Sequence, residues 1–487
     1  MEFQFPCVPL ITFLIFFFAV VRILKISSKA KKPNLNKLPP GPWKLPLIGN
    51  LHQLITSFPH HTLRDLSNKY GALMQLQLGE VPTVVISSAR VAEQVFKTHD
   101  TIFSQRPHVL ACEVMSYNCK AIIFTPYGNY WKQMRKIYIM ELLSPTRVQS
   151  FQSIRTEEVT DFIKSIALSE GSAINLSEKI FSLSYGITAK AAFGKKTKSQ
   201  EEFMRIIKET TKLSGAICLA DMYPSSGVLK LMSGTRIKAE KLHQGSDKIL
   251  ENIVNEHKEK RNKTDHQGVE ADLVDVLLQL QLQDDLEFPL GNNSIKAVMK
   301  DIFAAGSETS ATTVEWAMSE LLKNPKLMKK AQNEELKFLR LLVKETLRLH
   351  PPTLLILRQC RENCVINGYE IAAKAEVLVN AWAIQRDPFY WKDAEEFHPE
   401  RFSENSMDFR GTNFEYIPFG AGRRICPGSL FGVHGIELPL ASLLYHFDWK
   451  LPNGMKFEDL EMTESFGLTA RRKDDLFLIP VPYCTLK

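Results

Sequence analysis

A glycine-rich loop that presents a single cysteine is the feature that most constrains the fold of this chain. The loop runs from Pro418 to Gly428, carries Cys426, and is followed at 431–444 by an apolar stretch typical of a helix. Glycines let the backbone approach the sulfur closely, and both a helix N-terminus and the nearby Arg424 favour a thiolate. Such a site suits a soft anionic ligand to iron. A phosphate-binding loop is the alternative, but the Lys-Ser/Thr pair that it needs is absent.

The body of the 487-residue chain is predicted to be mainly helical, with small β-sheets. A periodicity of 3.6 residues marks helices near 60–70, 90–97, 128–142, 147–169, 201–213, 235–260, 294–323 and 335–349. Short strands are expected at 73–78, 81–86, 365–371 and 376–380, with a final pair near 467–481. We find no internal repeat and no change of composition along the chain, so a single large domain over 43–487 is the simplest interpretation.

The N-terminus contains an uncharged apolar run, Phe3 to Val21, that is long enough to span a bilayer. We interpret 3–24 as a retained transmembrane anchor, because no small-residue cleavage site follows it. Lysines and arginines are concentrated directly after the run, which places the body on the cytoplasmic side. Residues 25–42, basic and then rich in proline, are expected to form a hinge. A buried core helix at the N-terminus is the alternative.

Charge and cysteine content exclude two other classes of protein. The net charge of +7 is spread over 61 basic and 54 acidic residues, so no nucleic-acid-binding surface is predicted. The eight cysteines are scattered rather than arranged as a disulfide framework, which favours a reducing compartment. Cys360 and Cys364 have no second pair of ligands nearby, so they do not predict a zinc site.

Five residues of the cysteine loop carry a family resemblance. Their spacing fits the pattern F-x-x-G-x-R-x-C-x-G, and the matching residues are Phe419, Gly422, Arg424, Cys426 and Gly428. On these residues the chain resembles the cytochrome P450 family, and most of all the terpenoid-oxidising members of the plant microsomal 71 family. The resemblance implies haem b with its iron ligated by Cys426, and Phe419, Arg424 and Gly428 as further cofactor-binding residues.

The resemblance also implies the reaction and the partners. The chain is expected to be a monooxygenase that inserts one oxygen atom of O2 into a small hydrophobic substrate, with electrons from NADPH. No flavin or nicotinamide fingerprint is present in the sequence, so a separate membrane-bound NADPH–cytochrome P450 reductase is implied. The expected location is the endoplasmic reticulum membrane, crossed once, with the catalytic domain in the cytosol. A haem enzyme that rearranges a peroxide or dehydrates without O2 is a rival interpretation.

A polar, small-residue stretch interrupts the helix predicted at 294–323. In the stretch 304–310, Ala305, Gly306 and Thr309 share one helix face with Ile302. Glycine and serine cost stability inside a helix, and a gap for dioxygen would explain them. The family resemblance assigns proton delivery to Thr309 and Glu308. A buried polar kink is the alternative.

Two further motifs match the family. Glu345 and Arg348, spaced i, i+3, are usually a solvated surface pair. The resemblance instead implies a buried structural network with Arg401 of the Pro399–Phe402 segment. Trp131 and Arg135, spaced i, i+4, match a helix that reaches a haem propionate, and Arg358 and Arg424 match the other propionate-binding positions.

The substrate class is predicted from the segments that line the pocket in this family. They map to 107–127, 302–306, 353–357 and 467–469, and they include Ile302, Ala305, Gly306, Leu354 and Leu468. These segments are mostly apolar, and the stretch 310–318 resembles the plant branch, so a terpenoid substrate is predicted. Alkaloid and flavonoid substrates remain alternatives.

The chain departs from the family before Glu345. It runs directly from Gln332 through 333–339 into the next helix, whereas the family normally has a further stretch of helix and loop there. The haem-contacting motifs are intact, but the scaffold that leads to Glu345 and Arg348 is shortened. An inactive, haem-free variant is therefore the alternative from a different functional class.

Overall fold

The computed structural model describes residues 37–483, except 57, 197–198, 217, 264–270, 284–285, 335 and 404–405. The predicted anchor at 3–24 and residues 25–36 of the predicted hinge lie outside the described residues. None of the helices in the described part of the chain combines the length and apolar character that crossing a bilayer requires.

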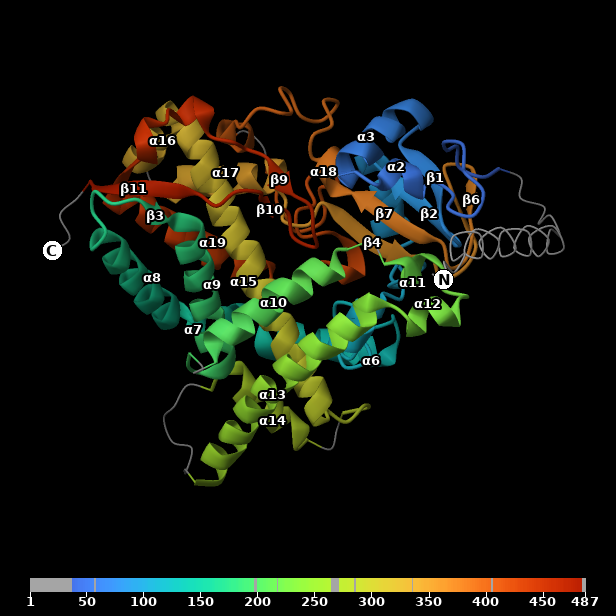
Figure 1. Ribbon diagram of the computed structural model, residues 1–487, viewed down its shortest axis with the longest axis horizontal. Coiled ribbons are helices and arrows are strands. Elements are labelled where there is room, and N and C mark those ends of the chain that lie inside the picture. Colours follow the sequence, from blue (N-terminus) through green and yellow to red (C-terminus); the bar gives the residue numbers. More distant parts are fainter. Residues whose placement is uncertain are drawn as a thin grey trace, which may run out of the picture.

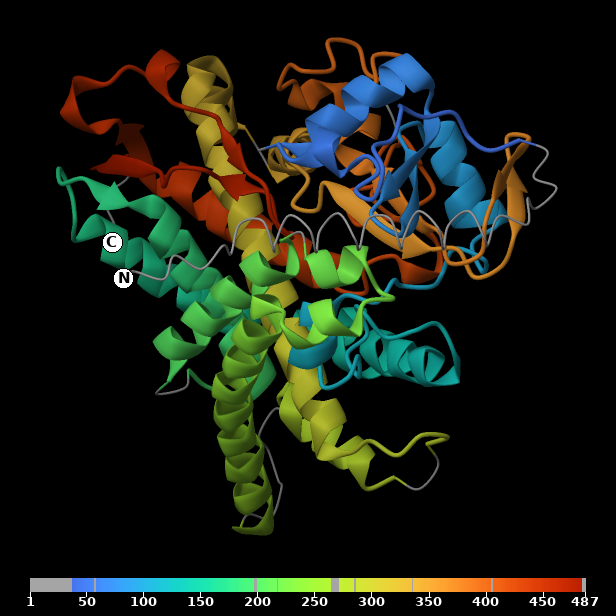
Figure 2. The same cartoon turned by 45° about the vertical axis from the view of Figure 1, so that its right-hand side comes forward.

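Helices form most of the molecule, and the longest of them, α15 (Asn292–Lys323), runs through its middle (Figures 1 and 2). It packs against α9, α17 and α19, and this contact forms the centre of the largest hydrophobic core. The other long helices are α3 (Pro59–Tyr70), α6 (Asn129–Ile137), α8 (Gln152–Ala167), α9 (Leu176–Phe193), α10 (Gln200–Ser214), α13 (Gly234–Lys263), α14 (Leu273–Gln281), α16 (Pro325–Asn333), α17 (Leu336–Leu349) and α19 (Ser429–His446). Short helices are α2 (Leu51–Leu54), α4 (Ala89–Glu93), α5 (Leu110–Met115), α7 (Pro145–Ser150), α11 (Leu219–Met222), α12 (Gly227–Leu231) and α18 (Ala381–Ile384).

The ends of the helices follow local sequence signals. Asn175 starts α9, because its side chain accepts a hydrogen bond from the backbone N–H of Glu178. Gly194 ends the same helix in the left-handed region, at φ 69°. Asp272 caps α14 in the same way, because its side chain accepts hydrogen bonds from the backbone N–H groups of Val274 and Asp275. These caps fix the two helices that pack beside α15.

Four small sheets complete the fold. The largest has the order β1 (Leu73–Leu78), β2 (Val81–Ile86), β7 (Glu376–Asn380) and β4 (Leu355–Gln359). In it, β2 and β7 are parallel, with Val84 opposite Val377, and the other pairs are antiparallel. The remaining sheets are β3 (Ile174–Asn175) with β11 (Phe477–Pro482) and β8 (Phe447–Lys450), β9 (Glu464–Ser465) with β10 (Arg471–Arg472), and β5 (Cys364–Ile366) with β6 (Tyr369–Ile371). The mainly helical fold with small sheets is therefore as predicted.

Two local predictions differ from the structure, and one strand was not predicted. The strand expected at 365–371 is the β5–β6 hairpin, because Asn367 and Gly368 both have positive φ, 49° and 77°, and form a tight turn. The helix expected at 147–169 is two helices that meet at Phe151. The apolar stretch before Arg358 forms strand β4, which pairs with β7.

The described end of the predicted hinge, residues 37–42, lies against β1. The backbone N–H of Gln75 donates to the carbonyl of Pro40 at 2.8 Å. A Cβ atom at Gly41 would lie 2.0 Å from the carbonyl oxygen of Gln75, so glycine is required for this close approach. Pro40 and Gly41 are therefore held against β1.

Candidate active site

A cavity of about 290 Å3 lies between the cysteine loop, α15, α6 and β4. Most of the predicted site residues line it, although they come from distant parts of the sequence. From the loop come Phe419, Arg424, Cys426 and Gly428; from α15 come Ile302, Ala305, Gly306 and Thr309; from α6 and β4 come Trp131, Arg135 and Arg358. Apart from the arginines, Asp301, Cys426 and a few hydroxyls, the lining is mostly apolar.

The loop fixes Cys426 through its backbone. The N–H of Cys426 donates to the carbonyl of Phe419 at 2.9 Å. Gly422 has φ 69°, and a Cβ atom there would lie 2.6 Å from the carbonyl oxygen of Phe96, so the loop needs glycine at this position. Burial raises the pKa of the Cys426 thiol, although the backbone N–H of Gly428 and the charge of Arg135 oppose this. A bound cation is therefore needed to keep the sulfur as a thiolate at neutral pH.

Four arginines converge on the cavity, three predicted and one, Arg106, not predicted. None of the four forms an ion pair with a described residue, and Arg424 donates instead to the carbonyls of Ser104, Ile122 and Thr125. Burial, and then the neighbouring Arg106 and Arg135, lower the pKa of Arg424 to about 9. Burial and the charges of Arg106 and Arg424 also lower the pKa of Arg358. Four crowded cations without a carboxylate partner form a site for an anion.

Trp131 adds an unused donor to this site. Its indole Nε1 is buried and has no hydrogen-bond partner among the described residues. The guanidinium of Arg424 lies 4.7 Å from the centroid of the Trp131 ring. A buried N–H without a partner is costly, so a ligand acceptor is expected beside it. The thiol, the arginines and the indole together fit a haem with its two propionates.

The face of α15 that lines the cavity is the one predicted. The hydroxyl of Thr309 donates to the carbonyl of Ala305 at 2.7 Å, one turn back along the helix. A Cβ atom at Gly306 would lie 3.2 Å from Cε1 of Phe431 and 3.4 Å from Cγ2 of Thr188. The close approach of α9 and α19 is thus a packing reason for glycine at 306, in addition to space in the cavity.

Glu308 lies on the other side of α15 and does not line the cavity. It is 2% exposed, and the hydroxyl of Tyr185 on α9 donates to its carboxylate at 2.8 Å. Burial raises the pKa of Glu308. The carboxylate of Glu308 therefore does not face the cavity that Thr309 lines, although both residues were predicted to deliver protons there.

Two residues expected to line the pocket lie elsewhere. Leu354 is buried in a separate small cluster with Trp382, Ala383 and Ala470. Leu468 is 40% exposed, and its backbone lies beside Gly215, which follows α10. Thr353, the residue before Leu354, lines the cavity instead.

Asp301 is a cavity residue that the sequence reasoning missed. It is the single acidic side chain among the residues that line the cavity, and burial raises its pKa to about 7. Its carboxylate accepts from the backbone N–H of Ile123 at 3.3 Å, which holds the segment before α6 against α15. Asp301 precedes Ala305 by four residues, and residues i and i+4 share a helix face. This spacing could have predicted that Asp301 lines the cavity.

The predicted network of Glu345, Arg348 and Arg401 is assembled and buried. Arg348 contacts both oxygens of Glu345, with Nε at 2.7 Å and Nη2 at 2.9 Å. Nε of Arg401 donates to the same carboxylate at 3.0 Å. Both Glu345 and Arg348 have 0% exposed side chains. Arg348 also donates to the carbonyls of Gln385 and Ala394, so the network ties α17 to the segment before the cysteine loop.

The junction of α16 and α17, where the departure from the family was predicted, is short. Only two residues, 334 and 335, separate the helices. A hollow of about 320 Å3 lies between this junction and the end of α19, lined by Leu336, Leu339, Ala441 and Tyr445 among others. Leu336 and Tyr445 are 69% and 61% exposed. The short junction thus leaves apolar side chains uncovered without disturbing the Glu345 network.

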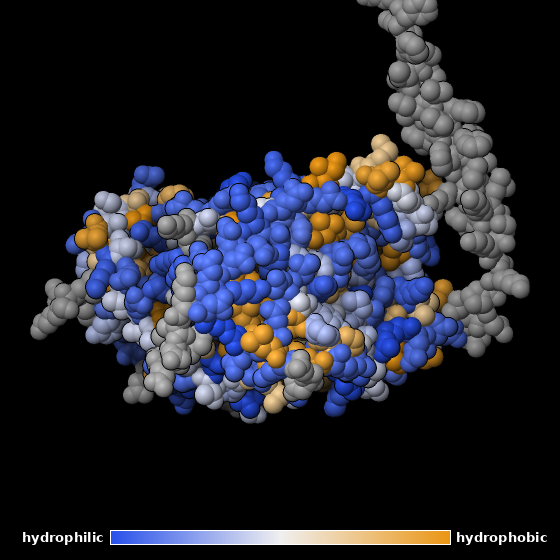
Figure 3. Space-filling model, turned by 90° about the horizontal axis from the view of Figure 1, so that it is seen from below, coloured by the Kyte–Doolittle hydropathy of each residue, from blue (hydrophilic) through white to orange (hydrophobic). Residues whose placement is uncertain are grey.

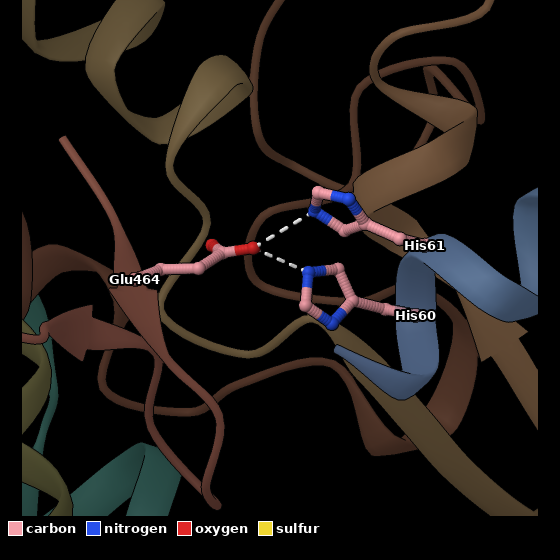
Figure 4. A group of neighbouring side chains, drawn as sticks. All are labelled: His60, His61 and Glu464. Atoms are coloured by element: carbon pink, nitrogen blue, oxygen red, sulfur yellow. Dashed lines mark hydrogen bonds and ion pairs between the residues drawn. The ribbon is translucent and has the colours of Figure 1, made fainter. Parts of the chain in front are cut away.

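A second polar cluster lies away from the cavity, at the start of α3. His60 and His61 both point Nε2 at one oxygen of Glu464 on β9, at 2.5 and 3.1 Å (Figure 4). Burial would raise the pKa of Glu464, but the hydrogen bonds from the two histidines and the charge of Arg386 hold it well below its usual range. Burial lowers the pKa of His60. The cluster connects the two ends of the described chain.

Comparison with known proteins decides the family. A family model for cytochrome P450 matches residues 39–477. The chain belongs to the cytochrome P450 family. It is 52% identical over 497 residues to tabersonine 16-hydroxylase 2 of Catharanthus roseus, covering 97% of this chain and 96% of that protein. It is 48% identical over 499 residues to premnaspirodiene oxygenase of Hyoscyamus muticus, covering 98% of each.

A solved structure agrees with the fold of this P450. A zebra fish cytochrome P450 with progesterone has a TM-score of 0.74 and 21% identity, and covers 87% of this chain and 99% of that chain. The family uses haem held by a cysteine thiolate, with electrons from NADPH through a reductase, so the predicted cofactors stand. The alignment with tabersonine 16-hydroxylase 2 is longer than the 487 residues of this chain, so it contains positions at which this chain has no residue. The location of the shortening before Glu345 stays a prediction.

Proposed function

We propose that this P450 holds haem b through Cys426 and oxidises a small hydrophobic substrate in the cavity beneath α15. The observation that carries the proposal is the convergence of Cys426, Thr309 and the four arginines on one cavity. When bound there, the haem supplies activation of dioxygen, because a thiolate ligand pushes electron density toward bound oxygen. Arg135, Arg358, Arg424 and Trp131 would hold its propionates through charge-assisted hydrogen bonds.

The chain's own part in the reaction is to deliver protons and exclude water. Thr309 holds a proton at Oγ1 and lines the same cavity as Cys426. Glu308 has a raised pKa and is a proton reserve behind the helix, but it must leave Tyr185 before it can supply Thr309. Apolar side chains such as Ile302 and Phe431 keep bulk water away from the reacting group.

The substrate class that we propose is a terpenoid. The cavity lining is mostly apolar, and premnaspirodiene oxygenase is among the relatives at 48% identity. The relatives named for tabersonine, at 50–52% identity, support the alkaloid alternative, and the flavonoid alternative has no such support among them. A flat, polar ring system is the least compatible with this lining.

We also propose that the protein is anchored in the endoplasmic reticulum membrane with the catalytic domain in the cytosol, and receives electrons from NADPH–cytochrome P450 reductase. The apolar run at 3–21 and the basic residues after it support this. Exposed apolar side chains also occur on α11, α12 and the start of α13, and they include Leu219, Val228, Leu231 and Ile237. Figure 3 shows hydrophobic surface on the side of the molecule where α11 and α12 lie. Exposed apolar side chains gathered on neighbouring helices suit contact with lipid.

The experiment that tests the proposal is turnover in microsomes that contain the full chain and a plant reductase. Terpenoids, alkaloids and flavonoids are supplied with NADPH, and products are analysed by mass spectrometry for the gain of one oxygen atom. The expected result is an NADPH- and O2-dependent product from a terpenoid, absent in the C426A variant. A product that forms without NADPH would support the rival interpretation of a rearranging or dehydrating haem enzyme. A chain that binds no haem would support the inactive variant.

A further inference from the structure

Cys360 and Cys364 take no part in the proposed reaction, yet their sulfurs lie 3.9 Å apart. Cys360 follows the last residue of β4, and Cys364 is the first residue of β5. Neither is cross-linked. Figures 1 and 2 show the hairpin that contains β6 at the edge of the molecule, away from α15. The pair therefore lies at a periphery that small reagents can reach.

We propose that Cys360 and Cys364 form a redox-active dithiol, which a peroxide converts reversibly into an intramolecular disulfide. A disulfide bond is about 2.05 Å long, so the two sulfurs must approach by about 1.9 Å. Rotation about the two Cα–Cβ bonds covers a displacement of this size.

The backbone holds both cysteines in place while their side chains rotate. The N–H of Cys360 donates to the carbonyl of Ala375 at 2.9 Å, and its carbonyl accepts from Lys374 at 2.8 Å. Cys364 pairs with Ile371 in the hairpin. No backbone hydrogen bond has to break for the sulfurs to meet. The contact that would be lost is the one from the Cys360 thiol to the carbonyl of Glu362, at 2.9 Å.

The surroundings give the two sulfurs different roles. Cys364 is partly exposed, whereas Cys360 is 1% exposed. The neighbouring Cys360 thiol, 3.9 Å away, lowers the pKa of the Cys364 thiol. Burial, in contrast, raises the pKa of Cys112 to about 12. Since the thiolate is the reactive form, Cys364 is the attacking sulfur and Cys360 the resolving one.

The oxidation balances in two steps. The Cys364 thiolate attacks one oxygen of hydrogen peroxide, the O–O bond breaks, and hydroxide leaves a sulfenic acid on Cys364. The Cys360 sulfur then attacks the sulfenic sulfur, the S–O bond breaks, and the hydroxyl departs as water with the thiol proton. Two electrons have passed from the sulfurs to the peroxide. A dithiol reductant restores both thiols by exchange.

The test is made on the reduced, full-length holoenzyme with hydrogen peroxide, followed by alkylation of the remaining thiols and trypsin. Arg361 lies between the cysteines, so trypsin separates them, and a disulfide joins the peptide ending at Arg361 to the peptide beginning at Glu362. The expected result is this linked pair of peptides, removed by dithiothreitol, absent in C360S and unchanged in the control variant C218S.

Two results would overturn the proposal. One is recovery of both cysteines as alkylated thiols after peroxide treatment that oxidises other cysteines of the chain. The other is a linked pair that forms as fast in urea as in the folded protein. Two cysteines four residues apart also meet in an unfolded chain. If the fold builds this site, the disulfide must form several-fold faster in the folded protein than in urea.

Discussion

Removal of the Glu345 carboxylate is expected to destabilise the protein more than any ordinary ion-pair deletion. In Glu345→Ala, the guanidinium of Arg348, fully buried, loses two hydrogen bonds at 2.7 and 2.9 Å, and that of Arg401 loses one at 3.0 Å. Truncation of one partner of a buried ion pair costs about 3–5 kcal/mol, because the remaining charge stays buried without compensation.

The magnitude converts to a modest but measurable change in melting temperature. At about 2.1 cal/mol/K per residue, roughly 450 folded residues give an unfolding entropy of about 0.9 kcal/mol/K. A loss of about 4 kcal/mol therefore lowers Tm by about 4 °C. Differential scanning calorimetry of the haem-loaded protein measures it.

The matched control is another intrahelical ion pair that lies on the surface. Glu240 and Arg236 on α13 are 2.9 Å apart, with side chains 47% and 45% exposed. Glu240→Ala is expected to cost less than about 0.5 kcal/mol, and thus to lower Tm by less than about 1 °C. A fall in Tm for Glu345→Ala no larger than that for Glu240→Ala would show that the buried network does not stabilise the fold more than a surface ion pair does.

Three more outcomes follow from the site and its surroundings. Arg424→Ala removes one of the four cations that face the cavity, so haem retained after gel filtration should fall several-fold; full retention would contradict the anion site. Thr309→Ala should lower kcat by about 10- to 100-fold while the haem spectrum stays unchanged, and normal turnover would exclude Thr309 as a proton donor. His60 has a lowered pKa in the folded state, so the unfolded chain binds the proton more readily, and stability should fall as the pH is lowered through about 6.5. In His60→Asn, the part of the pH dependence of Tm that is due to His60 should be absent. If the dependence of Tm on pH is unchanged in this variant, other groups cause it.

Site residues could be predicted from the sequence where they are close together in the chain. Cys426 in its loop and Glu345 with Arg348 on one helix turn are local patterns, and the structure places them as expected. The position of Glu308 was harder to predict, because adjacent helix residues face different directions. Its partner Tyr185 comes from a helix over 100 residues away in the sequence.

Long-range packing explains what the sequence did not show. Arg106 reaches the cavity from a loop without a motif, and its donor contacts are the carbonyls of Ile123 and Leu357. Leu354 was expected to face the pocket, but it packs against Trp382, Ala383 and Ala470 instead. Neither position has a periodic signal, since each depends on segments far away in the chain.

The most direct test of the central claim is the reduced, carbon-monoxide difference spectrum of the expressed full-length chain. We expect a long-wavelength Soret band, which reports haem iron with the Cys426 thiolate as its ligand, and the loss of this band in Cys426→Ala. A chain without the band, or with the shorter-wavelength form of a lost thiolate, would contradict it and would assign the chain to the inactive alternative with the shortened α16–α17 junction.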